Sequence, residues 1–353
     1  MNRQPIEVQT LYAELVEQLS ALDAHRTIGH LPGTFVTKSI KGQTYCYFQH
    51  LEPGGVKRQI YLGRQDPVLD AVVARFAIER DAAADDTASI SRLVALLRAG
   101  GALGTDAASA RVLQALADAA VFRYDGVLIG THAFVVLGNA LGVTWRGGSL
   151  RTQDVDLAAV QAMGVGVPVT PADVPEVLEN LKMGFLPVPG LDRVSPSTSF
   201  KVRGQGLRVD LLTPSRAQAS APVFVPRLGA AAQPLRFLDY LLESPLRAAV
   251  IGAGGVLVNV PDPARFAFHK LIVSGERPAA FATKRDKDLS QAAQVLEVLV
   301  EDRPGDIDLA WEALVERGSG WTKRATVGLK ALERFAPEVV HTVEVMTAHP
   351  RNG

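Results

Sequence analysis

The stretch Arg151-Thr-Gln-Asp-Val-Asp-Leu157 decides how the rest of the chain is interpreted, because it sets Asp154 and Asp156 one residue apart. On a β-strand, side chains at i and i+2 point to the same face. Two neighbouring carboxylates repel each other, and burial adds a desolvation cost, so a cation is needed to hold them together. We therefore expect a cation-binding strand here. A second interpretation, in which both aspartates form caps and surface salt bridges, remains open.

A third carboxylate and a glycine turn extend this pattern. Asp210 lies in the strand-like run Leu207-Arg-Val-Asp-Leu-Leu212, and Gly130-Thr131 follows the buried strand expected at residues 126–129. Three carboxylates suit Mg²⁺, with Mn²⁺ as the alternative, since hard cations are shared between a few carboxylates and substrate phosphates. The set Asp154, Asp156 and Asp210 thus predicts a metal-dependent phosphoryl or nucleotidyl transfer site. For Asp210, a structural role at a sheet edge remains open.

Composition limits the classes of protein that fit. The chain has 353 residues, 37 basic and 37 acidic, so its net charge of zero gives no general nucleic-acid signal. Cys46 is the single cysteine, which excludes an internal disulfide framework and a thiolate zinc cluster. The polar beginning lacks the apolar core of a signal peptide, and we expect a cytoplasmic protein of bacterial type. Residues 126–145 are long enough for a membrane span, but His132 and Asn139 favour a buried strand, turn and helix instead.

The chain is expected to fold as an α+β protein in three parts. Residues 1–106 combine an amphipathic helix, a β-meander of three short strands and a helix from Pro67 to Arg98. Residues 107–262 alternate strands and helices around the aspartates, and Ala230-Ala-Ala232 with nearby prolines indicates a loop. Residues 263–353 are mainly helical.

Three runs together resemble the nucleotidyltransferase fold of polymerase-β-like enzymes. They are Leu128-Ile-Gly-Thr-His-Ala133, Thr152-Gln-Asp-Val-Asp-Leu157 and Val209-Asp210. The family pattern is hG[GST] at a strand-to-helix turn, Dh[DE]h on the next strand and a later third carboxylate. More narrowly, four runs resemble a bacterial family of this fold that is distantly similar to AbiEii-type toxin transferases: Gly130–Ala133, Arg151–Leu157, Pro261–Lys270 and Lys284–Asp288. The Gly-Thr pair departs from the more usual Gly-Gly or Gly-Ser.

The resemblance implies a role for each residue type. Gly130 would let the backbone approach the triphosphate of an NTP such as ATP, and Thr131 and Arg151 would contact phosphates. Asp154 and Asp156 would hold Mg²⁺, and Asp210 would complete a second metal site or take the proton of the attacking hydroxyl. The cations that offset charge on the triphosphate are expected from Lys270, Lys284 and Lys287, with Lys270 and Lys287 foremost. For each lysine, a place on a solvated helix face remains open.

The region of residues 24–64 carries a local basic charge. It holds six Lys or Arg against one acid, with five aromatic residues among them. Basic residues mixed with aromatics can bind single-stranded nucleic acid through phosphate contacts and base stacking. One interpretation is therefore a guide for an RNA acceptor such as tRNA. The other is a small structural sheet with its aromatics in a core.

Three functions follow from these patterns. The first is transfer of a nucleoside monophosphate from an NTP to a hydroxyl on RNA, protein or a small molecule. The second is a catalytically silent protein of the same fold that binds nucleic acid or a protein partner. The third is a toxin-like or defence-associated transferase with the same chemistry. The NTP base, the acceptor and the oligomeric state are not indicated by the sequence.

Overall fold

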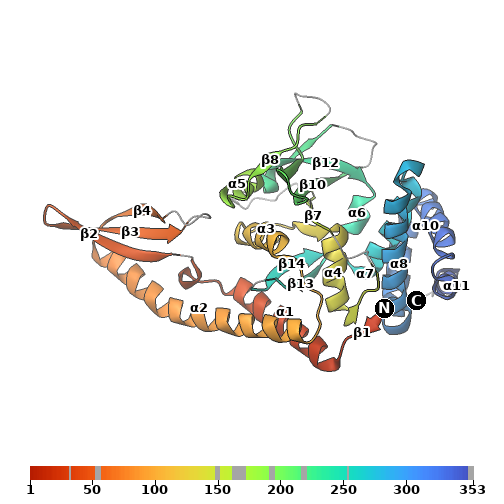
Figure 1. Cartoon of the computed structure of the whole chain (residues 1–353), viewed down its shortest axis with the longest axis horizontal. Helices are drawn as coiled ribbons and strands as arrows, with labels where there is room; N and C mark the ends of the chain where they lie inside the picture. Colours follow the sequence, from red (N-terminus) through yellow and green to blue (C-terminus); the bar gives the residue numbers. More distant parts are fainter. Residues whose placement is uncertain are drawn as a thin grey trace.

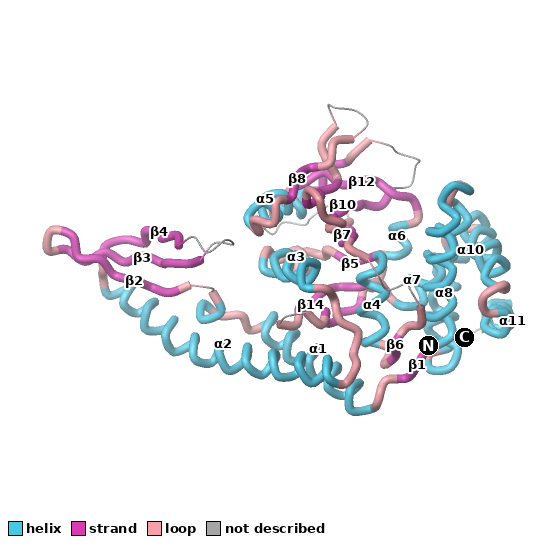
Figure 2. The backbone as a smooth tube through the Cα atoms, in the orientation of Figure 1, coloured by secondary structure: helices cyan, strands magenta, loops and turns pink. Residues whose placement is uncertain are grey.

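The computed structural model describes residues 1–31, 33–51, 57–147, 152–160, 172–190, 195–215, 221–252 and 254–348. Helices and strands alternate through the middle of the chain, and helices dominate its C-terminal third (Figure 1, Figure 2). The expected α+β class is confirmed.

Within the described residues, a seven-stranded sheet forms the centre of the molecule. Its path runs β11-β12-β10-β7-β5, with β9 added to β10 and β8 added to β9. Strand β7 pairs in parallel with β10 and antiparallel with β5. The strands are β5 (Val127–Ile129), β7 (Asp154–Ala158), β8 (Phe185–Pro187), β9 (Ser199–Val202), β10 (Arg208–Ser215), β11 (Val223–Val225) and β12 (Ala230–Arg236). The two strands expected to carry aspartates are thus direct neighbours.

Strand β12 corrects one expectation. The sequence at residues 230–232 predicts a loop, but β12 pairs in parallel with β10 and antiparallel with β11. Alanine has a weak intrinsic preference for strands, and packing in the sheet decides the outcome here. Ala230, Ala231 and Ala232 are all buried. The sequence prediction of a loop was wrong because small residues fit where the sheet is closely covered.

Helix α4 (Gly130–Ala140) follows β5 directly. The sequence predicts a helix from Ala133, so the observed helix begins three residues earlier, at Gly130 itself. The expected strand, turn and helix within residues 126–145 is confirmed in outline. None of the helices that the structure describes is long and apolar enough to cross a membrane. The other helices of this part are α3 (Ala107–Asp118), α5 (Val174–Asn180) and α6 (Leu238–Leu241).

The N-terminal region forms an arm. Helix α2 (Pro67–Ala99) extends away from the sheet, and the meander lies at its far end (Figure 1). Asp66 caps this helix by accepting a hydrogen bond from the Leu69 N–H at 2.8 Å, and Pro67 suits its first turn. The three expected strands of the meander are confirmed as β2 (Thr34–Ile40), β3 (Gln43–Leu51) and β4 (Lys57–Arg64).

Helix α1 (Ile6–Ala24) attaches the arm to the core. It packs on a hairpin of β13 (Leu246–Val250) and β14 (Val256–Val260), which the sequence patterns do not predict. The buried Tyr12 hydroxyl donates to the Ala249 carbonyl at 2.9 Å and accepts from the Ala249 N–H at 3.0 Å. A short pairing of β1 (Asn2–Arg3) with β6 (Val143–Thr144) adds a second attachment.

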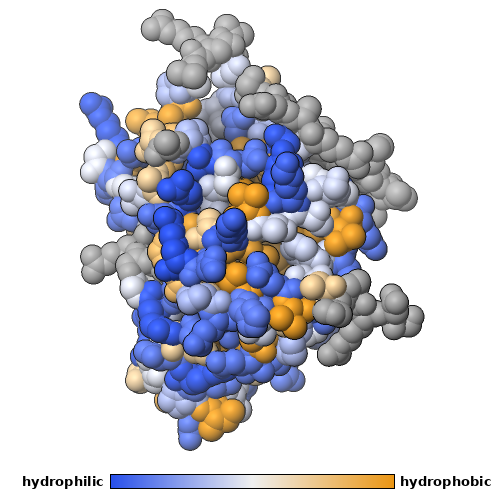
Figure 3. Space-filling model, turned by 90° about the vertical axis from the view of Figure 1, so that its right-hand side faces the viewer, coloured by the Kyte–Doolittle hydropathy of each residue, from blue (hydrophilic) through white to orange (hydrophobic). Residues whose placement is uncertain are grey.

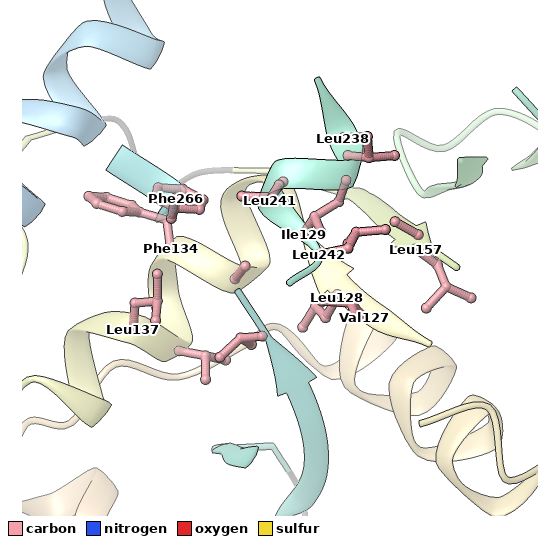
Figure 4. Packing of buried hydrophobic residues seen from close by; sticks show 14 of the residues in the cluster. Val127, Leu128, Ile129, Phe134, Leu137, Leu157, Leu238, Leu241, Leu242 and Phe266 are labelled. Carbon is pink, nitrogen blue, oxygen red and sulfur yellow. The ribbon is translucent and has the colours of Figure 1, made fainter. Parts of the chain in front are cut away.

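The C-terminal helices pack against the sheet region through one continuous hydrophobic cluster. Phe134 of α4 stacks on Phe266 of α7, with centroids 6.1 Å apart and rings 12° from parallel (Figure 4). The helices are α7 (Pro263–Glu276), α8 (Ala282–Asp302), α9 (Pro304–Glu316), α10 (Ser319–Leu332) and α11 (Pro337–Ala348), of which α11 was not expected. On their outer side, polar surface separates small hydrophobic groups (Figure 3). The cluster crosses the predicted boundary at residue 262, and the division into three domains stays a prediction.

The Tyr12 contact gives a test of how the arm is attached. Tyr12→Phe should lower the free energy of unfolding by about 1–3 kcal/mol, because it leaves the Ala249 N–H and C=O unpaired in a buried place. Urea unfolding followed by circular dichroism measures the change. Tyr124→Phe, at a partly exposed tyrosine on the core, is the matched control and should change the free energy by less than about 0.5 kcal/mol. Equal effects of the two substitutions would contradict the assignment.

Candidate active site

Asp156 and Asp210 are direct neighbours across two parallel strands. In the β7–β10 register Asp156 is paired with Asp210, and Asp154 is paired with Arg208. Residues paired across neighbouring strands point to the same face of a sheet, and so do residues two apart on one strand. The three expected carboxylates therefore share one face. Asp154 is exposed, whereas Asp156 and Asp210 are partly buried.

The glycine turn lies against this face. Ile129 is the partner of Asp156 in β5, and Gly130 comes next. Gly130 has a φ of +68°, and a Cβ built on it would collide with the Asp156 carboxylate. Glycine is therefore required here for two reasons, which are the positive φ angle and the lack of room for a Cβ atom. The first turn of α4, including the buried Thr131, begins beside the aspartates, with its backbone N–H groups at the helix start.

Two of the expected lysines come near the aspartates. Lys270 of α7 is close enough to Asp156 for its charge to oppose the rise in the pKa of that carboxyl. The pKa of Lys287 on α8 is lowered by burial and by the charge of Lys270, and Asp154 and Asp156 oppose that shift. Cations from two helices of the C-terminal third thus meet anions from the central sheet.

The other two expected basic contacts are not gathered in this way. Lys284 is exposed, and its Nζ lies 5.9 Å from the centroid of the Phe281 ring. It is not among the groups whose charge bears most on Asp156. Arg151 lies outside the described residues.

Residues 107–316, more than half of the chain, match the model of a family described as nucleotidyltransferase. The chain belongs to this nucleotidyltransferase family. No curated protein matches it. A solved structure, an antigenic nucleotidyltransferase-like protein from Paracoccidioides brasiliensis, is 15% identical over 64% of this chain and 94% of its own, with a TM-score of 0.32. That likeness is too distant to support conclusions about the site. The narrower resemblance to AbiEii-type transferases stays a prediction.

In this nucleotidyltransferase the Asp156 carboxyl has an unusual environment. Burial, then the charge of Asp210 and that of Asp154, raise its pKa to about 7. Lys270 and Arg208 act in the opposite direction. Desolvation and like charges both disfavour the ionised form, and an added cation would relieve both.

Arg208 supplies one such cation from the neighbouring strand. Its Nε donates to Asp210 Oδ1 at 2.8 Å. Among the residues that the structure describes, no three His, Cys, Asp or Glu side chains form a ready-made metal site. The donor chemistry of Asp154, Asp156 and Asp210 still suits a hard divalent cation, and the Asp156 environment favours one. An ion bound by all three would have to compete with Arg208 for Asp210.

Asp288 fixes Lys270 in place. Its buried carboxylate accepts from Lys270 Nζ at 2.8 Å and from Arg277 Nε at 2.5 Å. Burial acts to raise the pKa of Asp288, but the charge of Lys270 and the hydrogen bond from Arg277 outweigh it and hold that pKa below its usual value. Neither Asp288 nor Arg208 is among the site residues expected from the sequence. The spacing of Arg208 two residues before Asp210 on a strand is the signal that could have identified it.

His132 is a buried, neutral histidine near the same site. It is 3% exposed, and its Nε2 has no hydrogen-bond partner among the described residues. Burial, then the charge of Lys287, lower its pKa to about 4, while Asp106 opposes the shift. It lies in the first turn of α4, where its ring is packed in the interior and its Nε2 makes no hydrogen bond to a described residue.

The raised pKa of Asp156 predicts a pH-dependent cost to folding. A carboxyl whose pKa is higher in the folded protein stabilises it fully below its unfolded value near 4, and this contribution is lost as the pH rises through about 7. Asp156→Asn removes the titration. In EDTA, the free energy of unfolding of this variant relative to wild type should therefore rise by roughly 2 kcal/mol from pH 5 to pH 8. The exposed Asp81→Asn serves as control, and a flat difference for Asp156→Asn would contradict the prediction.

Asp288→Asn should be strongly destabilising. It leaves Lys270 and Arg277 without their shared buried anion, which costs about 3–5 kcal/mol. Because the pKa of Asp288 is lowered, its contribution is present above a pH near 4 and is lost as the pH falls below that. Asp286→Asn, on the same helix but in a surface pair with Arg334, should cost at most about 1 kcal/mol. Urea unfolding at pH 7 compares them, and similar costs would show that the buried pair is unimportant.

Proposed function

We propose that this protein transfers a nucleoside monophosphate from an NTP to a hydroxyl acceptor in a reaction that depends on Mg²⁺, with Mn²⁺ as a substitute. The observation that carries the proposal is the placement of Asp156 beside Asp210, with the Gly130 backbone against them. Lys270 and Lys287 approach the same aspartates from α7 and α8. Carboxylates, a phosphate-binding turn and cations are the parts that nucleotidyl transfer requires.

Each group has a task in the proposed reaction. Asp154 and Asp156 would hold the metal ion, which when bound would offset the negative charge of the phosphates and orient them. The N–H groups at the start of α4, with Thr131, contact phosphate oxygens, and Gly130 lets them approach. The acceptor hydroxyl forms a bond to the α-phosphorus while the bond from that phosphorus to the bridging oxygen breaks, and pyrophosphate leaves. Asp210 takes the proton of the hydroxyl.

The two lysines act on the leaving side of the reaction. Charge develops on pyrophosphate as it departs, and preorganised cations stabilise that charge without reorganising at the moment of transfer. Lys270 is already fixed by Asp288, so its position costs little during the reaction. Lys284 and Arg151 have no assigned task in this proposal.

One observation favours a second function. Arg208 neutralises Asp210 within the protein, which is the arrangement expected of a silent nucleotidyltransferase fold that binds nucleic acid or a protein partner. In the transferase, Asp210 must exchange this partner for the metal ion or the proton of the acceptor. The experiment below separates the two functions.

The proposal is tested by transfer of label from an α-³²P NTP, supplied with Mg²⁺ and either total RNA or cell lysate. Wild type should incorporate label, and EDTA should abolish incorporation. The double variant Asp154→Asn with Asp156→Asn should lose at least about 100-fold in rate, because metal binding fails. The control, Glu312→Gln with Glu316→Gln on the exposed side of α9, should keep the wild-type rate.

Two outcomes would contradict the transferase. Absence of incorporation by wild type with every NTP and both acceptor mixtures would favour the silent protein. Incorporation that survives in the double aspartate variant would place the reaction elsewhere in the molecule. Growth arrest on expression, relieved by the same double variant, would identify the transferase as toxin-like.

A further inference from the structure

The two faces of the meander differ sharply. On one face, Phe35 and Phe48 pack edge-to-face with each other and with Phe76 of α2, at centroid distances of 5.2, 4.9 and 6.0 Å. Cys46 is buried on the same side. The phenylalanines therefore form the small core that the structural interpretation expects, and the nucleic-acid interpretation stays a prediction for the tyrosines.

The tyrosines lie on the opposite face. Tyr47 pairs with Tyr61 across β3 and β4, and their ring centroids lie 5.4 Å apart. The Tyr45 ring lies 6.2 Å from that of Tyr61, and Lys38 Nζ lies 4.8 Å above the Tyr47 ring. Tyr61 is 56% exposed. We call Lys38, Tyr45, Tyr47 and Tyr61 the tyrosine face. Three large rings are thus placed side by side in contact with solvent.

Its surroundings are basic. The strands β2–β4 and the turn at Lys41 carry Lys38, Lys41, Lys57, Arg58 and Arg64, and the described residues 33–51 and 57–64 include no acid, in a chain whose net charge is zero. A basic surface with exposed aromatic rings is complementary to a flexible polyanion with flat, unpaired bases. Lysine is depleted at protein–protein interfaces, whereas Lys38 lies over the Tyr47 ring here, which favours a polyanion over a protein partner.

The tyrosine face is held rigidly. The meander is fixed to α2 by the phenylalanine core and by a hydrogen bond from Arg80 to the Gly33 carbonyl. Gly29 packs so closely on the Glu79 backbone that a Cβ would collide with it. Helix α2 has 33 residues and is therefore about 50 Å long, and it holds the meander outside the core (Figure 1). A preorganised surface loses little entropy on binding.

We propose that the tyrosine face binds a single-stranded segment of RNA, with bases stacked on the tyrosines and phosphates contacted by Lys38 and its basic neighbours. That this RNA is the acceptor rests on the proposed function, whereas the binding itself does not. The meander lies apart from the central sheet at the far end of α2 (Figure 1), which suits a long polymer, one part of which is held while another part reaches the carboxylates.

The test is fluorescence anisotropy with a fluorescein-labelled, unstructured RNA of about 20 nucleotides, titrated with full-length protein. Tyr45→Leu, Tyr47→Leu and Tyr61→Leu together should weaken binding at least about tenfold, because leucine keeps an apolar strand surface but cannot stack. The corresponding triple change to phenylalanine keeps the rings and should bind within about threefold of wild type. Tyr124→Leu is the matched control, and circular dichroism checks that each variant is folded.

Charge is tested separately. Each phosphate contact contributes about one unit to the slope of log K against log salt concentration. Lys38→Gln should therefore reduce the magnitude of this slope by about one, whereas Lys323→Gln, on the exposed side of α10, should leave it unchanged. Wild type that fails to bind RNA at up to about 100 μM protein, or leucine variants that bind like wild type, would overturn the proposal. So would a tyrosine-dependent dimer in sedimentation, since a second copy would then cover this face.

The two proposals fail in distinguishable ways. The variant Asp154→Asn with Asp156→Asn should bind RNA like wild type. RNA binding without label transfer by wild type would overturn the proposed function alone. If the leucine variant transferred label to RNA at the wild-type rate, only the inference that RNA bound at the tyrosine face is the acceptor would be overturned.

Discussion

The parallel pairing of β7 with β10 is the constraint on which the rest of this site depends. It places Asp156 directly beside Asp210, with Asp154 two residues away on the same face. Like charges in a partly buried place are unfavourable, and the raised pKa of Asp156 is the physical sign of that cost. Neighbouring elements place positive charges near these carboxylates, namely Arg208 from β10, Lys270 from α7 and Lys287 from α8. A fold that only had to be stable would replace these carboxylates with apolar residues, since buried ionic groups add little stability.

Asp288 shows how the charge balance extends outward. Lys270 lies between two anions, the buried Asp288 that fixes it and the Asp156 that it faces. Because Asp288 also accepts from Arg277, its negative charge is shared by two cations. Asp288 therefore does not fully neutralise Lys270, whose remaining positive charge acts on Asp156 in the sheet. A lysine without such a partner would lose side-chain conformational entropy whenever it became ordered beside the phosphates.

Local sequence patterns carried most of the architecture and the anionic half of the site. The Asp-Val-Asp run, the Gly-Thr turn and the Val-Asp run are contiguous motifs, so their strands could be predicted and spacing placed Asp154 and Asp156 on one face, whereas only the strand pairing places Asp210 beside Asp156. Asp288, Arg208 and the β13–β14 hairpin were not identified, because their roles arise from partners far away in the sequence. Strand β12 was predicted as a loop because alanine has little intrinsic strand preference, so the sequence does not show that these alanines pack in a sheet. The lysines could be grouped on helix faces, but only packing separates Lys287, near the aspartates, from the exposed Lys284.

The distribution of charged side chains at the site also affects where an RNA could bind. Affinity for nucleic acid comes mainly from cations that neutralise phosphates. Among the described residues of the site, Arg208 and Lys270 are already bonded to carboxylates, and three aspartates share the face that they adjoin. A long polyanion therefore gains little by binding at the carboxylates themselves. The basic strands of the meander, at the far end of α2, could supply that affinity without adding fixed cations that would compete with a metal ion at Asp156 (Figure 1). In the proposed transferase, the negative charge of the aspartates would therefore favour RNA binding at a place apart from the reaction.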